Sequence, residues 1–161
     1  LFRSSAASDV YKRQGSVGIN STTPQATLDI DGHTLFKTYS ERVKYLDISS
    51  NVVTVDLSQA QTFICTATSD ITQFTLTNLP IQATSFTLRV EQDATGSRSV
   101  GIDTFKTTGG STIPVYWPGN VVPQVTTTAS RTDIYSFKIF DGSNPTTSGL
   151  YGVVSGQNFL N

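Results

Sequence analysis

Short runs of alternating apolar and polar residues recur along this chain, with turn residues between them at intervals of about ten residues. The run over 86–90 reads Phe-Thr-Leu-Arg-Val, and the run over 135–139 reads Tyr-Ser-Phe-Lys-Ile. A two-residue period is typical of a strand with one face in a core and the other in water. No window shows a sustained 3.6-residue period. The pattern therefore predicts an all-β fold with very little helix.

The composition supports strands and gives the chain little charge. Threonine and serine fill 44 of the 161 positions, and threonine packs well on a pleated sheet because its Cβ is branched. We predict an antiparallel, jelly-roll-like β-sandwich of about 8–10 strands with an extended N-terminal leader. The net charge of −1 gives no electrostatic basis for binding nucleic acid, and no apolar stretch is long enough for membrane insertion.

The alternation also predicts which side chains form the core. We assign to it the apolar members of the alternating runs, together with the phenylalanine at position 63. The predicted core residues are Val53, Val55, Phe63, Phe74, Leu76, Phe86, Leu88, Val90, Tyr135, Phe137, Ile139 and Val153.

The chain is expected to have three segments. Residues 1–14 show no strand alternation and resemble translated sequencing-adapter read-through from metagenomic assemblies. If they are read-through, the native chain continues upstream of Gly15. The alternative is that residues 1–14 form a short native helix or a flexible arm. Residues 15–42 have too few apolar side chains for a core and are expected to form a leader or stalk, with a strand over 26–30 and a hairpin turn at 31–32. Residues 43–161 then form the β-sandwich domain.

Residue types that carry catalysis are scarce. The single histidine, His33, follows a turn, and the sequence contains no Gly-x-Ser-x-Gly nucleophile elbow. One histidine with one cysteine cannot complete a structural zinc site, and Cys65 lies in an apolar run that predicts a buried side chain. We therefore predict no enzyme activity, no metal and no cofactor. A polysaccharide hydrolase that pairs two of the scattered carboxylates is an alternative.

Aromatic and amide side chains in the loops are candidates for binding. Tyr116 and Trp117 lie between two prolines, and aromatic faces on a protruding loop can stack on a ligand or a partner chain. We name Tyr116, Trp117, Asn120 and Asn144 as candidate ligand contacts. The alternative is that Trp117 plugs the end of the sandwich or an interface between subunits.

Two sets of motifs resemble phage proteins. Residues 15–32, Gly-Ser-Val-Gly-Ile-Asn-Ser-Thr-Thr-Pro-Gln-Ala-Thr-Leu-Asp-Ile-Asp-Gly, resemble the leader (V/L)GIGTTxPxAxLDVxG of many phage tail-fibre and virion-appendage proteins, departing from it at Asn20. A downstream series resembles a β-rich terminal domain of tail-fibre-like proteins of marine phages. This series consists of segments 86–100, 116–119, 123–129, 133–137 and 152–159.

This resemblance implies a function without catalysis. The expected protein is a structural component of a phage virion, part of a tail fibre or surface appendage, made in the host cytoplasm. It implies a homotrimer in contact with other virion proteins, and the family offers no catalytic residues to transfer. A module at the fibre tip that binds a host-surface glycan or receptor is the alternative function, for which the loops around Trp117 and residues 141–148 are the candidates.

Overall fold

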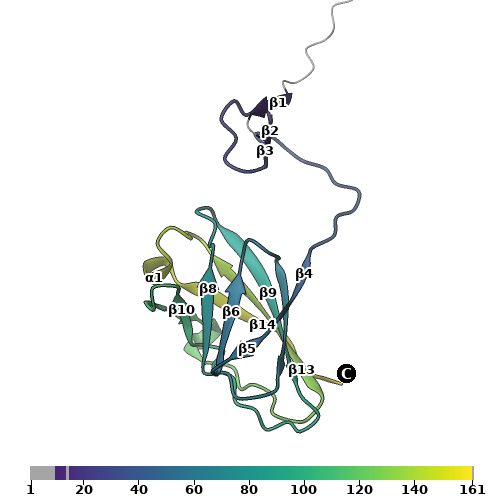
Figure 1. Ribbon diagram of the computed structural model, residues 1–161, viewed down its shortest axis with the longest axis vertical. Coiled ribbons are helices and arrows are strands. Elements are labelled where there is room, and N and C mark those ends of the chain that lie inside the picture. The colour runs from purple at the N-terminus through teal and green to yellow at the C-terminus, as the bar shows by residue number, and fades with distance from the viewer. Residues whose placement is uncertain (1–9, 14, 161) are drawn as a thin grey trace, which may run out of the picture. The chain divides into compact units, whose positions relative to one another are not determined.

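The computed structural model describes residues 10–13 and 15–160 of a chain that divides into two compact units, Leu1–Ser40 and Glu41–Asn161 (Figure 1). The regular secondary structure of the described residues is almost entirely β, with two short helical turns, η1 (Pro118–Asn120) and α1 (Pro145–Ser148). The predicted all-β class is confirmed. No helix among these residues combines the length and apolarity that a membrane crossing requires.

The smaller unit holds one three-stranded sheet. Its central strand β2 (Ser16–Ile19) pairs antiparallel with β1 (Val10–Arg13) and parallel with β3 (Leu28–Ile30). Residues 10–13 thus form a strand although the sequence shows no alternation there, because strand pairing requires backbone hydrogen bonds and no apolar face. The read-through interpretation of residues 1–14 stays a prediction, and positions 1–9 and 14 lie outside the described residues.

The turn at residues 31–32 does not close the predicted hairpin. Strand β3 ends at Ile30, and its partner β2 precedes it in the chain, so no described strand after the turn pairs with β3. The Asp-Gly pair thus follows the end of β3, but the chain after it does not return to pair antiparallel with β3.

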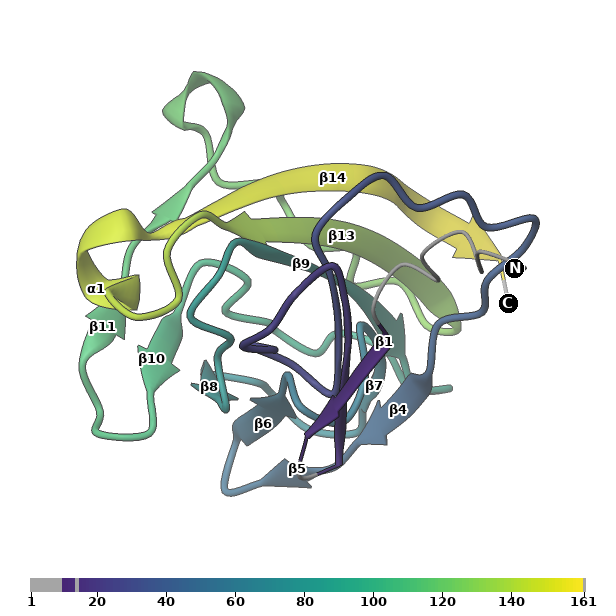
Figure 2. The same cartoon turned by 90° about the horizontal axis from the view of Figure 1, so that it is seen from above.

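Two sheets make up the larger unit (Figure 2). The five-stranded sheet has the order β11 (Thr112–Ile113), β10 (Phe105–Thr107), β8 (Gln73–Thr77), β6 (Val52–Asp56), β5 (Ile48–Ser49). The six-stranded sheet has the order β12 (Val115–Tyr116), β14 (Leu150–Leu160), β13 (Arg131–Ile139), β9 (Thr84–Gln92), β7 (Thr62–Ala67), β4 (Val43–Leu46).

From β6 to β10 the chain passes to the other sheet at every strand. Strands β6, β8 and β10 run parallel in one sheet, and β4, β7 and β9 run parallel in the other. Each passage through both sheets is one coil of a short β-solenoid, so equivalent residues such as Val53, Phe74 and Phe105 lie in register. Strands β13 and β14 then extend the six-stranded sheet in antiparallel fashion from β9.

Antiparallel pairing was predicted, whereas both sheets are mixed, with antiparallel pairs such as β13 with β9 and parallel pairs such as β6 with β8. The jelly-roll-like detail is not confirmed. Turn residues mark where a strand ends, but they do not specify which sheet the chain enters next. The larger unit also has more described strands than expected, because β5, β11 and β12 are two-residue pairings that leave no alternating pattern in the sequence.

An aromatic core fills the space between the two sheets. Phe74 and Phe105 from successive coils stack with ring centroids 5.2 Å apart, and Phe137 lies 5.0 Å from Phe105 and 5.1 Å from Phe86. Cys65 is buried as predicted, and burial raises the pKa of its thiol to about 12, so the thiol is protonated at neutral pH.

All predicted core residues except Val153 are buried. Val153 is 48% exposed, because the inward positions at the start of β14 belong to Leu150 and Gly152. Trp117 occupies the space above Gly152, where a Cβ atom would lie 2.7 Å from the indole ring. The sequence pattern therefore assigned Val153 to the wrong face.

Candidate functional site

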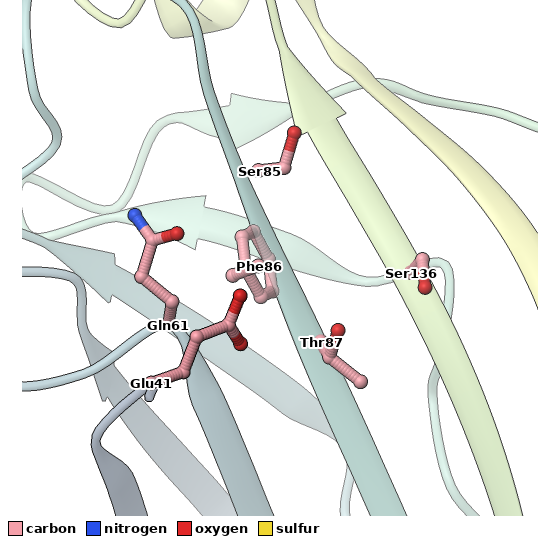
Figure 3. Close-up of a pocket in the computed structure, with 6 residues that line it drawn as sticks. All are labelled: Glu41, Gln61, Ser85, Phe86, Thr87 and Ser136. Carbon is pink, nitrogen blue, oxygen red and sulfur yellow. The ribbon is translucent and has the colours of Figure 1, made fainter. Parts of the chain in front are cut away.

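The outer face of the six-stranded sheet carries two adjoining hollows. The larger hollow measures about 270 Å³ and the smaller about 120 Å³. Both are lined by Ser85 of β9 and Ser136 of β13, so we treat them as one outer groove. The larger hollow adds Phe137, Lys138, Phe140, Tyr151 and Val153, and the smaller adds Glu41, Gln61, Phe86 and Thr87 (Figure 3).

Three exposed aromatic rings gather at the β14 side of the outer groove, and we call them the aromatic cluster. The Tyr151 ring centroid lies 5.2 Å from that of Tyr116 and 5.2 Å from that of Phe140. The Phe140 and Tyr151 rings are nearly perpendicular, at 82°, and Lys138 Nζ lies 5.4 Å from the Phe140 centroid. The rings are 44–57% exposed, so they offer apolar surface to a ligand beside a cation.

Backbone pairing explains how the aromatic cluster forms. Strand β12 pairs in parallel with the beginning of β14, which places Tyr116 directly beside Tyr151. Gly149, which precedes β14, has a φ of 66°, and a Cβ atom there would lie 2.5 Å from the Tyr116 ring. Glycine at this position therefore permits both the left-handed backbone and the close approach of the tyrosine.

Trp117 lies on the other side of the chain from Tyr116, because successive residues of an extended backbone point in opposite directions. Only 6% of Trp117 is exposed, and its ring contacts Tyr135 at 6.1 Å and Phe137 at 5.6 Å between centroids. Its buried Nε1 has no hydrogen-bond partner among the described residues. Of the two interpretations of Trp117, the structure favours the one in which it plugs the core.

The two candidate asparagines lie in exposed turns. Asn120 ends η1 with a φ of 57°, and Asn144 precedes α1 and donates hydrogen bonds to the Asp141 carboxylate and to Ser143 Oγ. Hydrogen bonds from Ser143 and then Asn144 lower the pKa of Asp141. Of the predicted contacts, only Tyr116 belongs to the aromatic cluster.

Sequence reasoning missed Phe140, Tyr151 and Lys138. One signal was present for Phe140, because it directly follows Ile139, and two consecutive apolar residues at the end of a strand cannot both face the core. Tyr151 and Lys138 occupy ordinary outward positions, so only the pairing of β13 with β14, which sets Lys138 opposite Tyr151, brings them together.

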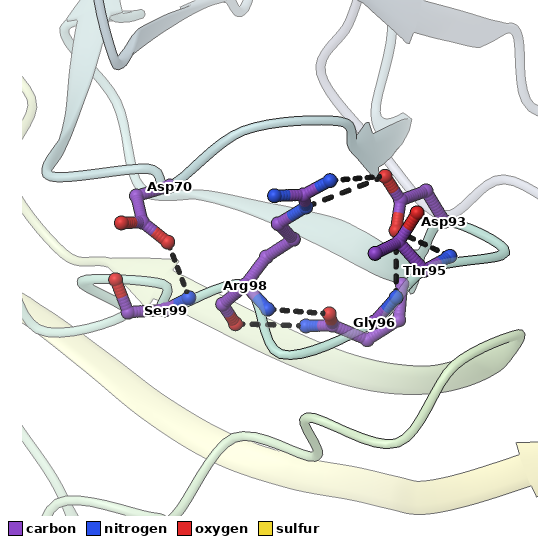
Figure 4. A network of polar contacts seen from close by, with 7 residues as sticks. Asp70, Asp93, Thr95, Gly96, Arg98 and Ser99 are labelled. Atoms are coloured by element: carbon purple, nitrogen blue, oxygen red, sulfur yellow. Dashed lines mark hydrogen bonds and ion pairs between the residues drawn. The ribbon is translucent and has the colours of Figure 1, made fainter.

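Carboxylates elsewhere in the larger unit stabilise turns by accepting hydrogen bonds. Asp93 accepts hydrogen bonds from the Arg98 guanidinium at 2.9 Å and from the N–H groups of Thr95 and Gly96 (Figure 4). The Arg98 hydrogen bond is the largest of the effects that lower the pKa of Asp93. Among the described residues, no group of three or more histidine, cysteine or acidic side chains could hold a metal ion.

A buried polar network joins the end of β14 to β13. Asp133 is 1% exposed and accepts hydrogen bonds from Thr126 N–H at 2.7 Å, Asn158 N–H at 2.9 Å and the Tyr135 hydroxyl at 3.0 Å. Gln157 Nε2 donates to the same carboxylate at 3.2 Å and to the Gln124 carbonyl at 2.5 Å. The network holds the loop over 121–128 and the last residues of β14 in place.

Comparisons with known proteins gave no match: no family model, no curated protein and no solved structure is similar to this chain.

Proposed function

We propose that this protein is a non-enzymatic structural component of a phage virion, part of a tail fibre or another appendage. The observation that carries the proposal is the architecture that accompanies the tail-fibre-like motifs. A small unit with one three-stranded sheet, which includes the leader strands β2 and β3, precedes a β-solenoid-like unit with an aromatic core. An appendage must stay folded outside the cell, and stacked coils supply a continuous core without a disulfide, which one cysteine cannot form within the chain.

The free edge of β14 supports assembly with other chains. Strand β12 pairs with β14 only as far as Tyr151, and beyond that residue no described strand pairs with the outer side of β14. Residues 150–160 contain no charged residue and no proline, the features that commonly protect an exposed edge. We therefore expect a neighbouring copy in a homotrimer, or another virion protein, to cover this edge.

Light scattering on the purified chain tests the structural role. We expect a mass three times the 17.4 kDa of one chain. Val154→Lys adds a charge to β14 beyond its pairing with β12, at a residue that does not line the outer groove, and should shift the mass toward that of a monomer. Thr66→Lys, at an exposed position on β7, should leave the mass unchanged. A monomeric wild-type chain would contradict the homotrimer. Turnover of a surface polysaccharide would instead favour the hydrolase alternative.

The aromatic cluster favours a second candidate function, recognition of a host-surface glycan or receptor. Exposed aromatic rings beside a groove are unusual for a surface that contacts only water, and they suit stacking on a ligand. This function is compatible with the first, because a structural appendage can also bind its host.

A further inference from the structure

We propose that the outer groove binds an acidic saccharide, a sugar that carries a carboxylate, with that carboxylate beside Lys138. The inference rests on the second candidate function. The proposed site lies on the outer face of β9, β13 and β14, whereas the sequence analysis placed it in the loops around Trp117 and residues 141–148. The proposed ligand class is also narrower.

The apolar part of the site suits the flat C–H face of a sugar ring. Phe140 and Tyr151 stand at 82° to one another and form a corner above the larger hollow. Tyr116 supports Tyr151 from its other side, so the Tyr151 ring is held in place before a ligand arrives. A rigid aromatic side chain loses little conformational entropy on binding. The volume of about 270 Å³ lies just below the roughly 300–1,000 Å³ of sites for drug-sized ligands, which fits a ligand that only partly enters the groove.

The charge of the site favours an acidic sugar over a neutral one. Lys138 is the one charged residue that lines the larger hollow, and it is exposed. The ion pairs found in the described chain join Arg89 to Glu91 and Arg98 to Asp93, so they leave the Lys138 ammonium available to a ligand. Its attraction for a carboxylate is stronger beside apolar rings than in bulk water, because the local dielectric constant is lower.

The polar part of the groove orients the ligand. Ser85 and Ser136 are shared by the two hollows, and Glu41 and Gln61 line the smaller hollow on the other side of β9 from Ser136, with the Glu41 carboxylate pointing toward β9 (Figure 3). Sugar hydroxyls can donate hydrogen bonds to the Glu41 carboxylate and accept them from the Gln61 amide. The same carboxylate repels an anion, so the acidic group belongs at the Lys138 end. Glu41 also accepts a hydrogen bond from Thr62 Oγ1 at 2.9 Å, and Ser136 Oγ lies 2.7 Å from Ser155 Oγ, so a sugar would join side chains that the protein already holds in position.

Titration of the full chain with paired probes tests the ligand class. The probes are a uronic acid oligosaccharide and a sialylated trisaccharide, each compared with its methyl ester, which keeps the rings and removes the charge. We expect at least one acid to bind about tenfold more tightly than its ester, and more weakly as salt is added. Backbone NMR shifts should change at Ser85, Ser136 and Val153. Equal binding of acid and ester, or no binding of either acid, would overturn the inference and leave the light-scattering test of the appendage role unaffected.

Matched variants test the location. Tyr151→Ala and Lys138→Gln should each weaken binding of the acid by about tenfold, and Lys138→Gln should also abolish the preference for acid over ester. Tyr151→Phe keeps the ring and should bind like the wild type, which separates lost stacking from misfolding. Tyr45→Ala on β4 and Lys106→Gln on β10 are the controls and should bind normally. Unchanged binding in the first two variants, or shifts confined to residues 117–120 and 141–148, would overturn the site.

Discussion

Asp133 is a buried carboxylate whose described partners are N–H and O–H groups, and this makes its contribution to stability depend on pH. Burial alone would raise the pKa of Asp133, but hydrogen bonds from Thr126, Asn158 and Tyr135 outweigh burial and lower the pKa. A carboxyl whose pKa is lower in the folded state stabilises the fold above its unfolded pKa of about 3.9. That stabilisation is lost as the pH falls through the folded-state pKa.

We expect Asp133→Asn to lower the free energy of unfolding by about 1–3 kcal/mol at pH 7, because one side of an amide cannot accept the N–H donors that the carboxylate satisfies. Urea denaturation from pH 7 down to pH 3 measures the effect, and the gap between wild type and variant should narrow below about pH 4. Asp103→Asn, at an exposed position, is the control. Equal stability of Asp133→Asn and wild type at pH 7 would show that the network is not stabilising.

Gly152 is required by the position of Trp117. A Cβ atom at residue 152 would lie 2.7 Å from two atoms of the indole, so Gly152→Ala must displace the ring and should destabilise the fold by about 1–3 kcal/mol. Trp117 is the single tryptophan, so its fluorescence should shift to the red as water reaches it. Gly109→Ala, whose Cβ would meet only Thr107 Oγ1 at 3.8 Å, should change neither property. Unaltered emission from Gly152→Ala would contradict the packing.

At the scale of the elements, β13 connects the two sheets through Phe137. The Phe137 ring contacts Phe86 of its own sheet, Phe105 of the facing sheet and Trp117. Phe137→Ala should therefore lower the free energy of unfolding by about 3–5 kcal/mol, as expected when a buried aromatic ring is removed. Phe140→Ala, three residues later and 57% exposed, should cost less than about 1 kcal/mol. Chemical denaturation compares the two, and similar losses would mean that the inward face of β13 is misassigned.

Alternation along each strand was sufficient to predict the buried face of β6, β8, β9 and β13, because that signal is local. Pairing was not predictable, since the parallel match of Phe74 with Phe105 joins strands separated by a complete coil. The aromatic cluster was only partly predictable for the same reason. Tyr116 was predicted as a candidate ligand contact because it lies in a loop between two prolines. Its contact with Tyr151 was not predictable, because that contact depends on the pairing of β12 with β14.

At the scale of the whole molecule, the core belongs to one of the two units. Every residue of the hydrophobic core cluster lies beyond residue 41. Within residues 15–40 the one buried position is Gly18, and Leu35, Phe36 and Tyr39 are 62–98% exposed. The two short strands of the leader, β2 and β3, therefore recover little apolar burial against a backbone ordering cost of roughly 1–2 kcal/mol per residue.

We expect the leader to open far more often than the larger unit. In the full chain, amides of residues 28–30 should exchange with deuterium at least about a hundredfold faster than those of residues 86–90, because opening the leader exposes almost no core. As a control, deleting residues 1–14 should leave the melting temperature of the larger unit unchanged, because the hydrophobic core lies within that unit. Equal protection of residues 28–30 and 86–90 would show that the leader folds cooperatively with the larger unit and does not behave as a connector.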